Sequence, residues 1–171
     1  IYLVSSDAGL AVLPWEIEKP KDKDEIPFAA ILKGKVPDLY KEKIKVFRND
    51  DFFAPVASGS SAADQMVVIP CSMGSLARIR HGSSGSLLER SADVMIKEEK
   101  PLIICPRESP LSVIHLENML ALAKLGVRIV PPVPAFYQKP QTISDIVDFI
   151  VGKVLECMKI DHKLYPVWNE K

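Results

Sequence analysis

The stretch Gln65-Met-Val-Val-Ile-Pro-Cys-Ser-Met-Gly-Ser-Leu-Ala77 decides the fold that this sequence predicts. Its apolar run 66–69 is rich in β-branched residues, which is typical of a buried strand. Pro70 has no N–H to donate, so we expect the strand to end there. Small residues follow at 71–75, and a helix-compatible pattern begins at Leu76. A strand, a small-residue turn and a helix start expose N–H groups at the positive end of a helix dipole, where phosphate groups and flavin edges bind.

A second stretch of small residues, Ala57-Ser-Gly-Ser-Ser61, lies just upstream. Two such loops so close in sequence suggest one ligand held between them. A pair of ordinary turns between strands and helices explains the same residues, and the local pattern alone favours that simpler interpretation.

The composition is that of a folded chain without a strong charge bias. Its 171 residues are enough for one domain with a sizeable core, and 47% of them are apolar. Lys and Arg total 22, as do Asp and Glu, which argues against general binding to nucleic acid or to an anionic membrane. No apolar run approaches the ~20 residues of a membrane-spanning helix. We therefore expect neither a nucleic-acid partner nor a membrane span.

The three cysteines, Cys71, Cys105 and Cys157, are isolated from one another. An odd, scattered set favours reduced thiols in a cytoplasmic protein over a disulfide framework. No Cys/His pair has the spacing of a zinc site, so we expect no structural metal. Cys71 could act as a nucleophile with His81 or His115 as its base, but a buried and inert cysteine is the more common case.

Strand and helix patterns alternate along the chain. Strands are predicted at 1–5, 45–47, 66–69, 101–105 and 127–130, and helices at 8–13, 86–99, 112–125 and 142–158. The last of these helices carries an apolar stripe along one face, and Thr142 with Asp145 predicts a capping box at its start. The polar region 18–45 predicts a surface connection with one irregular helix around 28–32. This alternation implies parallel strands joined by right-handed crossovers. We therefore predict an α/β fold, an open parallel sheet with helices on both faces, as one domain over 1–171.

Ligands of such sheets bind beyond the carboxyl ends of the strands. Arg107 and Glu108 follow one predicted strand, where an Arg fork suits a phosphate or carboxylate and a neighbouring Glu can move a proton. A surface ion pair that closes a turn explains the pair equally well. Tyr137 follows a proline-rich segment and could stack on a flat ligand or fill the core. Lys153 could reach an anion or could instead extend its charged end to solvent. Lys97 could also reach an anion, or could simply complement the dipole at the end of its helix.

Six motifs occur in a fixed order along the chain. They are Ala57-Ser-Gly-Ser-Ser61, Pro70-Cys-Ser72, Leu88-Glu-Arg-Ser-Ala-Asp-Val94, Pro106-Arg-Glu-Ser-Pro110, His115-Leu-Glu-Asn-Met119 and Pro131-Pro-Val-Pro-Ala-Phe-Tyr137. Together they resemble the flavin prenyltransferase (UbiX) family, collinearly from about Ile1 to Trp168. The resemblance implies a Rossmann-like flavoprotein that joins a dimethylallyl group from dimethylallyl monophosphate to reduced FMN. It also implies a homo-oligomer, usually a dodecamer with FMN sites at subunit interfaces, whose prenylated FMN serves a UbiD-type decarboxylase.

The resemblance also implies a role for individual residues. The residues that would line FMN are Ser6, Ser72, Met73, Gly74, Ser75 and Arg107. Those that would hold the prenyl phosphate are Tyr137 and Lys153, with Lys97 and Arg107. Catalysis would rest on Glu16 and Glu108, which handle protons, and on Lys97. No metal is needed if Lys and Arg supply the positive charge.

Two departures from the family pattern stand out. The family opens with a strand and a Gly-Ala-Ser-Gly loop that holds the FMN phosphate, and this sequence starts after that point. The family commonly has Arg where this chain has Lys153, which keeps the charge but loses the two-point grip on phosphate.

Two other functions stay open. One is an FMN-dependent decarboxylase of the phosphopantothenoylcysteine type, although its Pro-Ala-Ser-Ala-Asn-Thr stretch is not found at 56–61. The other is a non-catalytic subunit that carries FMN to a partner.

Overall fold

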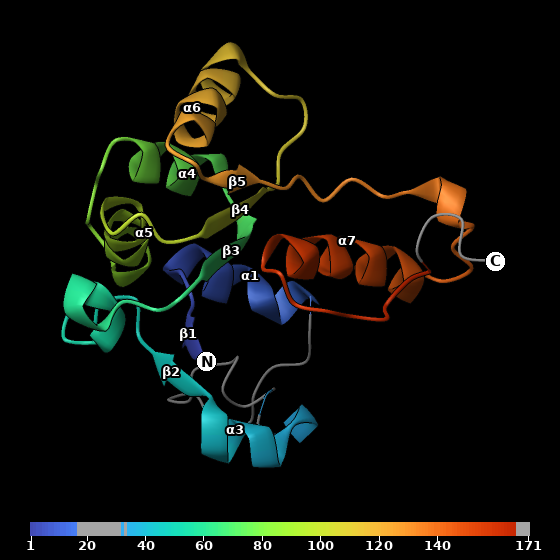
Figure 1. Cartoon of the computed structure of the whole chain (residues 1–171), viewed down its shortest axis with the longest axis horizontal. Coiled ribbons are helices and arrows are strands. Elements are labelled where there is room, and N and C mark those ends of the chain that lie inside the picture. The colour runs from blue at the N-terminus through green and yellow to red at the C-terminus, as the bar shows by residue number, and fades with distance from the viewer. Residues whose placement is uncertain (17–31, 33, 167–171) are drawn as a thin grey trace. The chain divides into compact units, whose positions relative to one another are not determined.

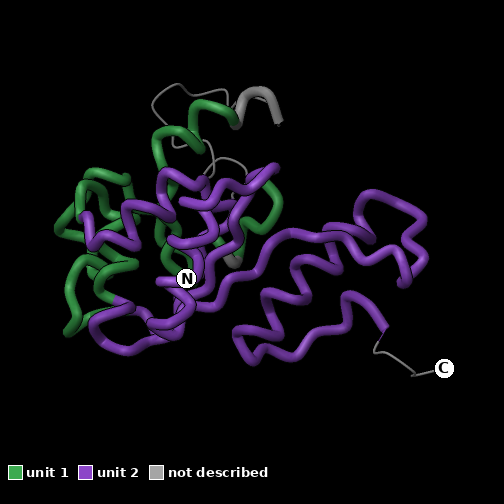
Figure 2. Tube along the Cα trace, turned by 90° about the horizontal axis from the view of Figure 1, so that it is seen from above, with its two compact units in different colours: residues 1–62, 84–94 green, residues 63–83, 95–171 purple. Residues whose placement is uncertain are grey.

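A computed structural model describes residues 1–16, 32 and 34–166 (Figure 1). The chain divides into two compact units, one of residues 1–62 and 84–94 and the other of residues 63–83 and 95–171 (Figure 2). The single domain expected from the sequence stays a prediction. No helix in the part of the chain that the structure describes is long and apolar enough to cross a membrane.

The first unit contains a two-stranded parallel sheet. Strands β1 (Tyr2–Val4) and β2 (Lys45–Phe47) pair with Tyr2 opposite Lys45. Both strands were predicted. Helix α1 (Asp7–Glu16) begins after Ser6, whose hydroxyl accepts the N–H of Gly9 at 3.1 Å. This helix continues past its predicted end at residue 13.

The prediction of a largely irregular connection over 18–45 is wrong at its end, where helix α3 (Pro37–Lys43) forms. Pro37 occupies the first turn, where its fixed φ suits a helix and its missing N–H is not needed. Lys41 and Lys43 lie in the last turn, where they complement the helix dipole. The helix predicted around 28–32 lies, except for residue 32, outside the described residues.

The core of the first unit joins the small-residue loop to helix α5 (Leu87–Lys97), which ends in the second unit. The buried residues Ala54, Val56 and Leu87 pack together, and β1 and β2 contribute Val4 and Phe47. The loop itself forms two 3-10 turns, η1 (Pro55–Ala57) and η2 (Gly59–Ser61).

The second unit holds a three-stranded parallel sheet in the order β3-β4-β5. Its strands are β3 (Met66–Cys71), β4 (Leu102–Pro106) and β5 (Arg128–Ile129). The prediction that β3 ends at Pro70 is wrong. The pairing register shifts between Val68 and Cys71, so the ladder passes over Pro70 and resumes with Cys71 opposite Pro106.

Helices cover this sheet as the sequence predicts. Helix α7 (Ile143–Cys157) packs through Val154 on Ile103 and Cys105 of β4. Side chains alternate along a strand, so Leu102 and Ile104 point to the other face, where they are also fully buried. Helices α4 (Met73–Arg80) and α6 (Val113–Lys124) pack against each other in the same unit. The predicted α/β architecture of parallel strands and helices is confirmed.

The apolar stripe predicted on α7 is only partly buried. Val154 is 6% exposed, whereas Ile143 is 81% exposed and Val147 49% exposed. The capping box predicted at the start of this helix is confirmed, because Asp145 and Thr142 exchange backbone-to-side-chain hydrogen bonds of 2.9 and 3.2 Å. The helix therefore begins as expected, but leaves part of its apolar surface uncovered in the single chain.

Candidate functional site

The start of α4 has the strand–turn–helix geometry expected of an anion site. The Ser72 hydroxyl caps the helix, accepting the N–H of Ser75 at 3.2 Å and lying 3.0 Å from the Ser75 hydroxyl. Met73 is buried at 6% exposure and fixes the turn to the core. Gly74 is exposed in the first turn. Ser72, Gly74 and Ser75 therefore lie together at the positive end of the helix dipole.

Arg78 adds a cation to this turn, and the sequence analysis did not identify it. Its Nη2 donates to the Ser75 hydroxyl at 3.3 Å, and a Cβ built on Gly74 would lie 3.3 Å from its Nη1. Residues four apart share one face of a helix. The spacing between Gly74 and Arg78 was the signal that could have revealed this contact.

The end of β4 lies beside the same turn. The backbone N–H of Arg107 donates to the Cys71 carbonyl at 3.0 Å, next to Ser72. The Arg107 and Glu108 side chains are exposed. Glu108 accepts the Ser109 N–H at 3.1 Å, and among the described residues it forms no ion pair with Arg107. The structure thus brings Arg107 to the 71–75 turn, and the alternative of a turn-closing ion pair is not observed.

Cys71 is poorly suited to act as a nucleophile. Its side chain is 1% exposed, and burial, with a smaller effect of nearby Cys105, raises its pKa to about 12. Burial also raises the pKa of Cys105, to about 11. The proposed base His115 is engaged elsewhere, since its Nδ1 accepts the Ser112 N–H at 3.2 Å in the cap of α6. These observations support the buried, inert cysteine. All three cysteines are free.

Tyr137 and Lys153 are brought together by Phe149. The Tyr137 ring, in η3 (Phe136–Gln138), meets the 8% exposed Phe149 ring edge-on at 6.2 Å. Lys153 Nζ lies 5.9 Å from the centroid of the same ring and 2.7 Å from Glu156 Oε2. The hydrogen bond to Glu156 is the main reason that the pKa of Lys153 is raised. The two residues expected to hold the prenyl phosphate therefore share one aromatic support.

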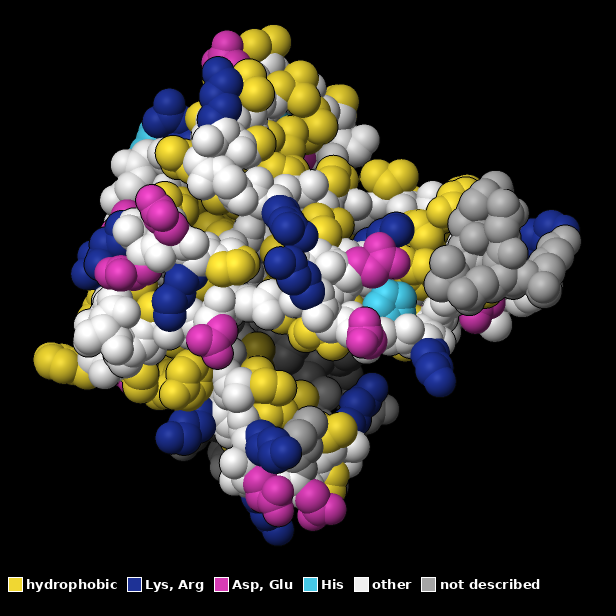
Figure 3. Space-filling view, in the orientation of Figure 1, with side chains coloured by type: hydrophobic (Ala, Val, Ile, Leu, Met, Phe, Trp, Pro, Cys, Tyr) yellow, Lys and Arg dark blue, Asp and Glu magenta, His cyan; other side chains and the backbone are white. Residues whose placement is uncertain are grey.

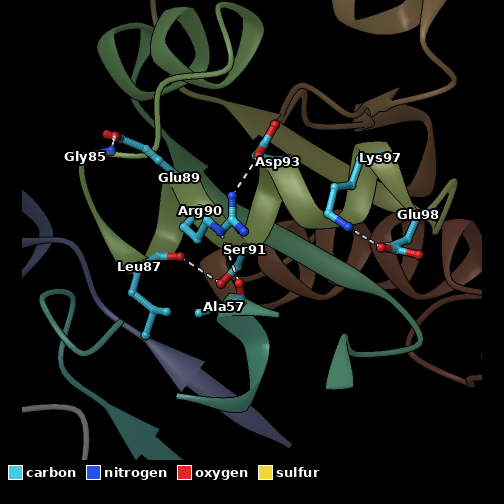
Figure 4. Close-up of polar contacts among 9 residues, drawn as sticks. All are labelled: Ala57, Gly85, Leu87, Glu89, Arg90, Ser91, Asp93, Lys97 and Glu98. Carbon is cyan, nitrogen blue, oxygen red and sulfur yellow. Dashed lines mark hydrogen bonds and ion pairs between the residues drawn. The ribbon is translucent and has the colours of Figure 1, made fainter. Parts of the chain in front are cut away.

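Lys97 lies apart from Arg107 within one chain. It is the last residue of α5 and pairs with Glu98 (Figure 4). Strand β4 starts shortly afterwards, at Leu102, so Lys97 lies near the amino end of this strand, whereas Arg107 follows its carboxyl end. Within one chain the length of β4 therefore separates Lys97 from Arg107, and a shared role of the two residues at one phosphate stays a prediction.

The remaining predicted residues lie in the first unit. Ser6 caps α1, as described above. Its neighbour Ser5 is 8% exposed, and its hydroxyl has no hydrogen-bond partner among the described atoms. A buried hydroxyl without a partner is uncommon, and a ligand atom could satisfy it. Glu16 ends α1, but its side chain lies outside the described part of the structure.

Arg90 places a guanidinium at the small-residue loop, and the sequence analysis gave it no role. Its Nε donates to the Ala57 carbonyl at 3.0 Å and its Nη1 to Asp93 Oδ2 at 3.4 Å (Figure 4). Arg90 and Asp93 both belong to the motif at 88–94 that supported the family resemblance. The motif was therefore the available signal, but the contact with Ala57 depends on tertiary structure.

Known proteins match this chain over most or all of its length. A family model described as Flavoprotein matches residues 2–155. The flavin prenyltransferase UbiX of Halalkalibacterium halodurans is 56% identical over 174 residues, covering 100% of this chain and 81% of that protein. The chain belongs to the flavin prenyltransferase (UbiX) family. Another flavin prenyltransferase, from Methanocaldococcus jannaschii, is 39% identical, and the match covers 99% of this chain and 97% of that protein.

Solved structures of flavin prenyltransferase relatives have the same fold. A dodecameric FMN-dependent UbiX-like decarboxylase from Escherichia coli O157:H7 superposes with a TM-score of 0.84 at 38% identity, covering 98% of this chain and 83% of that one. AnUbiX (PadA1), in complex with FMN and dimethylallyl pyrophosphate, gives a TM-score of 0.84 at 39% identity over 99% of this chain and 82% of that one. The predicted family and flavoprotein fold are confirmed.

Proposed function

We propose that this protein transfers a dimethylallyl group from dimethylallyl monophosphate to reduced FMN and releases prenylated FMN and phosphate. The observation that carries this proposal is the turn at 72–75, where a capped helix start lies beside Arg78 and next to the end of β4 at Arg107. The family membership supports it, as does the relative whose structure contains FMN with a dimethylallyl donor.

The donor groups of this chain suit FMN. The Gly74 N–H, the Ser72 and Ser75 hydroxyls and the Arg107 guanidinium can bind the polar edge of FMN, with Met73 beneath the turn. Ser6, in the first unit, is proposed as a further FMN ligand from the family pattern alone. The partnerless Ser5 hydroxyl is a buried donor of the kind that a ligand satisfies. When bound, reduced FMN supplies the electron-rich ring that accepts the prenyl group.

The cationic residues serve the phosphate of the prenyl donor. Lys153 and Arg107 offset the negative charge that grows as the phosphate leaves, while the Tyr137 hydroxyl donates to one of its oxygens. Lys97 contributes from a neighbouring subunit in this proposal, because β4 separates it from Arg107 within one chain. Glu108 and Glu16 hold and move protons at the phosphate and at the flavin.

An oligomer fits the exposed apolar surface of α6. Val113 is 70% exposed and Ile114 67% exposed, and hydrophobic side chains gather over this part of the structure (Figure 3). A second copy of the chain would cover such a surface. We infer a homo-oligomer, a dodecamer like the solved relative from Escherichia coli. The product then requires a recipient, for which we propose a UbiD-type decarboxylase in the cytoplasm.

Product analysis tests the proposed function. The protein is incubated anaerobically with reduced FMN, dimethylallyl monophosphate and a metal chelator, and the flavin is analysed by mass. We expect a prenyl adduct with reduced FMN and none with oxidised FMN. Release of carbon dioxide from an aromatic or cysteinyl acid, without an adduct, would indicate the decarboxylase. FMN that is bound and recovered unchanged under all conditions would indicate the carrier.

A further inference from the structure

Lys153 lies in a cage of side chains from α7 and from the segment that follows this helix. Its Nζ donates to Glu156 Oε2 at 2.7 Å. The same atom lies 5.9 Å from the centroid of the Phe149 ring and 5.7 Å from that of Tyr165. We call Phe149, Glu156, His162 and Tyr165 the Lys153 cage.

The carboxylate of the cage is itself held in place. The Tyr165 hydroxyl donates to Glu156 Oε1, the oxygen that Lys153 does not use. His162 Nε2 lies 3.7 Å from the same oxygen, and the His162 side chain is only 11% exposed. Glu156 is therefore fixed on both sides, by the lysine that it binds and by residues of the following segment.

Gly152 allows this segment to approach α7. A Cβ at position 152 would lie 2.6 Å from His162 Cε1 and even closer to the Tyr165 ring, distances that real Cβ atoms do not show. The His162 and Tyr165 rings pack with centroids 5.1 Å apart, and Tyr165 packs on Phe149 at 4.9 Å. The glycine that immediately precedes Lys153 thus makes room for two members of the cage.

A lysine needs such surroundings more than an arginine does. An Arg fork is rigid and pre-organised for phosphate, whereas a Lys ammonium is a point charge on a flexible stem. The ammonium has three N–H donors, and the bond to Glu156 engages one of them. The two rings limit where the stem can move, while the Lys153 side chain remains 45% exposed. Tyr165 also forms a side-chain hydrogen bond with the ammonium, which still leaves a donor for an oxygen anion that approaches from solvent.

We propose that Glu156 and Tyr165 are positioning residues, which aim the Lys153 ammonium at the phosphate of the prenyl donor. This inference rests on the proposed function, but concerns residues that touch Lys153 and not the donor. Among the described residues, Glu156 of α7 and Tyr165 of the following segment face the ammonium. His162 of that segment lies next to Glu156. The raised pKa of Lys153, caused chiefly by Glu156, keeps the ammonium charged.

A double-mutant cycle in the FMN-loaded protein tests the proposal. We expect Glu156→Gln to raise the KM for dimethylallyl monophosphate roughly tenfold, as loss of an orienting partner does elsewhere, while kcat stays nearly unchanged. Tyr165→Phe keeps the ring and should raise the KM less. In a Lys153→Arg background, Glu156→Gln should change the KM by no more than about twofold, because the Arg fork is already pre-organised.

Matched controls separate positioning from a general structural effect. Asp148→Asn makes the same charge change on the same helix and should leave the KM unaltered. An unchanged KM in Glu156→Gln, or an equal rise in both backgrounds, would overturn the proposal. Calorimetric titration of dimethylallyl monophosphate into protein loaded with oxidised FMN gives the same comparison without turnover. Absence of prenylated FMN from wild type would instead contradict the proposed function, and the binding cycle would still decide the role of Glu156.

Discussion

Gly152→Ala should destabilise the protein, although alanine usually stabilises a helix. Replacing an interior helical Gly by Ala is typically worth about 1 kcal/mol in favour of the folded state. Here the new methyl group would lie 2.6 Å from His162 Cε1, whereas ordinary contacts begin at 3.4 Å. The His162 and Tyr165 rings must therefore move, and overpacking of this kind costs about 1–3 kcal/mol. The two effects together predict a net loss of up to about 2 kcal/mol.

Gly34→Ala is the matched control. Gly34 is helical, and a methyl group there would meet no atom of the described residues within 4 Å. We expect Gly34→Ala to raise the Tm slightly and Gly152→Ala to lower it, with a difference of about 4–8 °C for a gap of about 2 kcal/mol between them. Hydrogen exchange at 161–165 should rise in Gly152→Ala alone. Equal stabilisation by both substitutions, with exchange unchanged, would refute the close packing of this segment on α7.

Three further predictions concern the candidate site. Arg107→Ala should weaken binding of FMN or of dimethylallyl monophosphate by roughly 1.5–3 kcal/mol, measured by calorimetry, and wild-type affinity for both ligands would remove Arg107 from the site. Glu108→Gln should keep FMN bound but slow product formation by ~10²-fold or more, whereas an unchanged rate would exclude a role in proton transfer. Cys71 should resist alkylation at pH 8 in the folded protein, because burial raises its pKa to about 12 and the thiol is therefore protonated at pH 8. Rapid labelling of Cys71 at pH 8, shown by peptide mapping, would contradict its buried, protonated state.

Elements with strong local patterns were predictable from the sequence. The β-branched runs gave β3 and β4 because a buried parallel strand is apolar on both faces. Thr142 and Asp145 located the start of α7 because a capping box needs only residues three apart. These features depend on neighbours in sequence, so sequence periodicity and capping rules were sufficient. The start of α4 was predicted less well, because the helical pattern was expected from Leu76, whereas the helix begins at Met73 with Ser72 as its cap.

Features that depend on tertiary contacts were not predictable. Asn49 receives hydrogen bonds from the Leu87 and Leu88 N–H groups, so the start of α5 is capped by a residue far away in the sequence as well as by the adjacent Ser86 hydroxyl. Strand β3 resumes after Pro70 because β4 supplies a partner for Cys71, which no property of proline reveals. The sequence likewise did not show that Lys97 ends α5 five residues before β4 begins, while Arg107 follows the other end of that strand.

The anchoring of Lys153 shows the same limit. The sequence revealed a lysine on the flank of α7, and the resemblance implied a phosphate ligand. That Tyr165 and Glu156 hold this lysine depends on how the segment after α7 folds back onto Gly152. Such a return of the chain has no periodic signature, so the members of the cage could be identified only from the structure.

The stoichiometry of phosphate release tests the central claim most directly. Reduced FMN and dimethylallyl monophosphate are mixed anaerobically with the protein, and inorganic phosphate is followed by phosphorus NMR while the mass of the flavin is measured in parallel. Transfer of the prenyl group predicts one phosphate released for each FMN that gains a dimethylallyl group, and no release when FMN is oxidised. Phosphate released without any change in flavin mass, or a flavin that stays unmodified while the donor remains intact, would contradict the account.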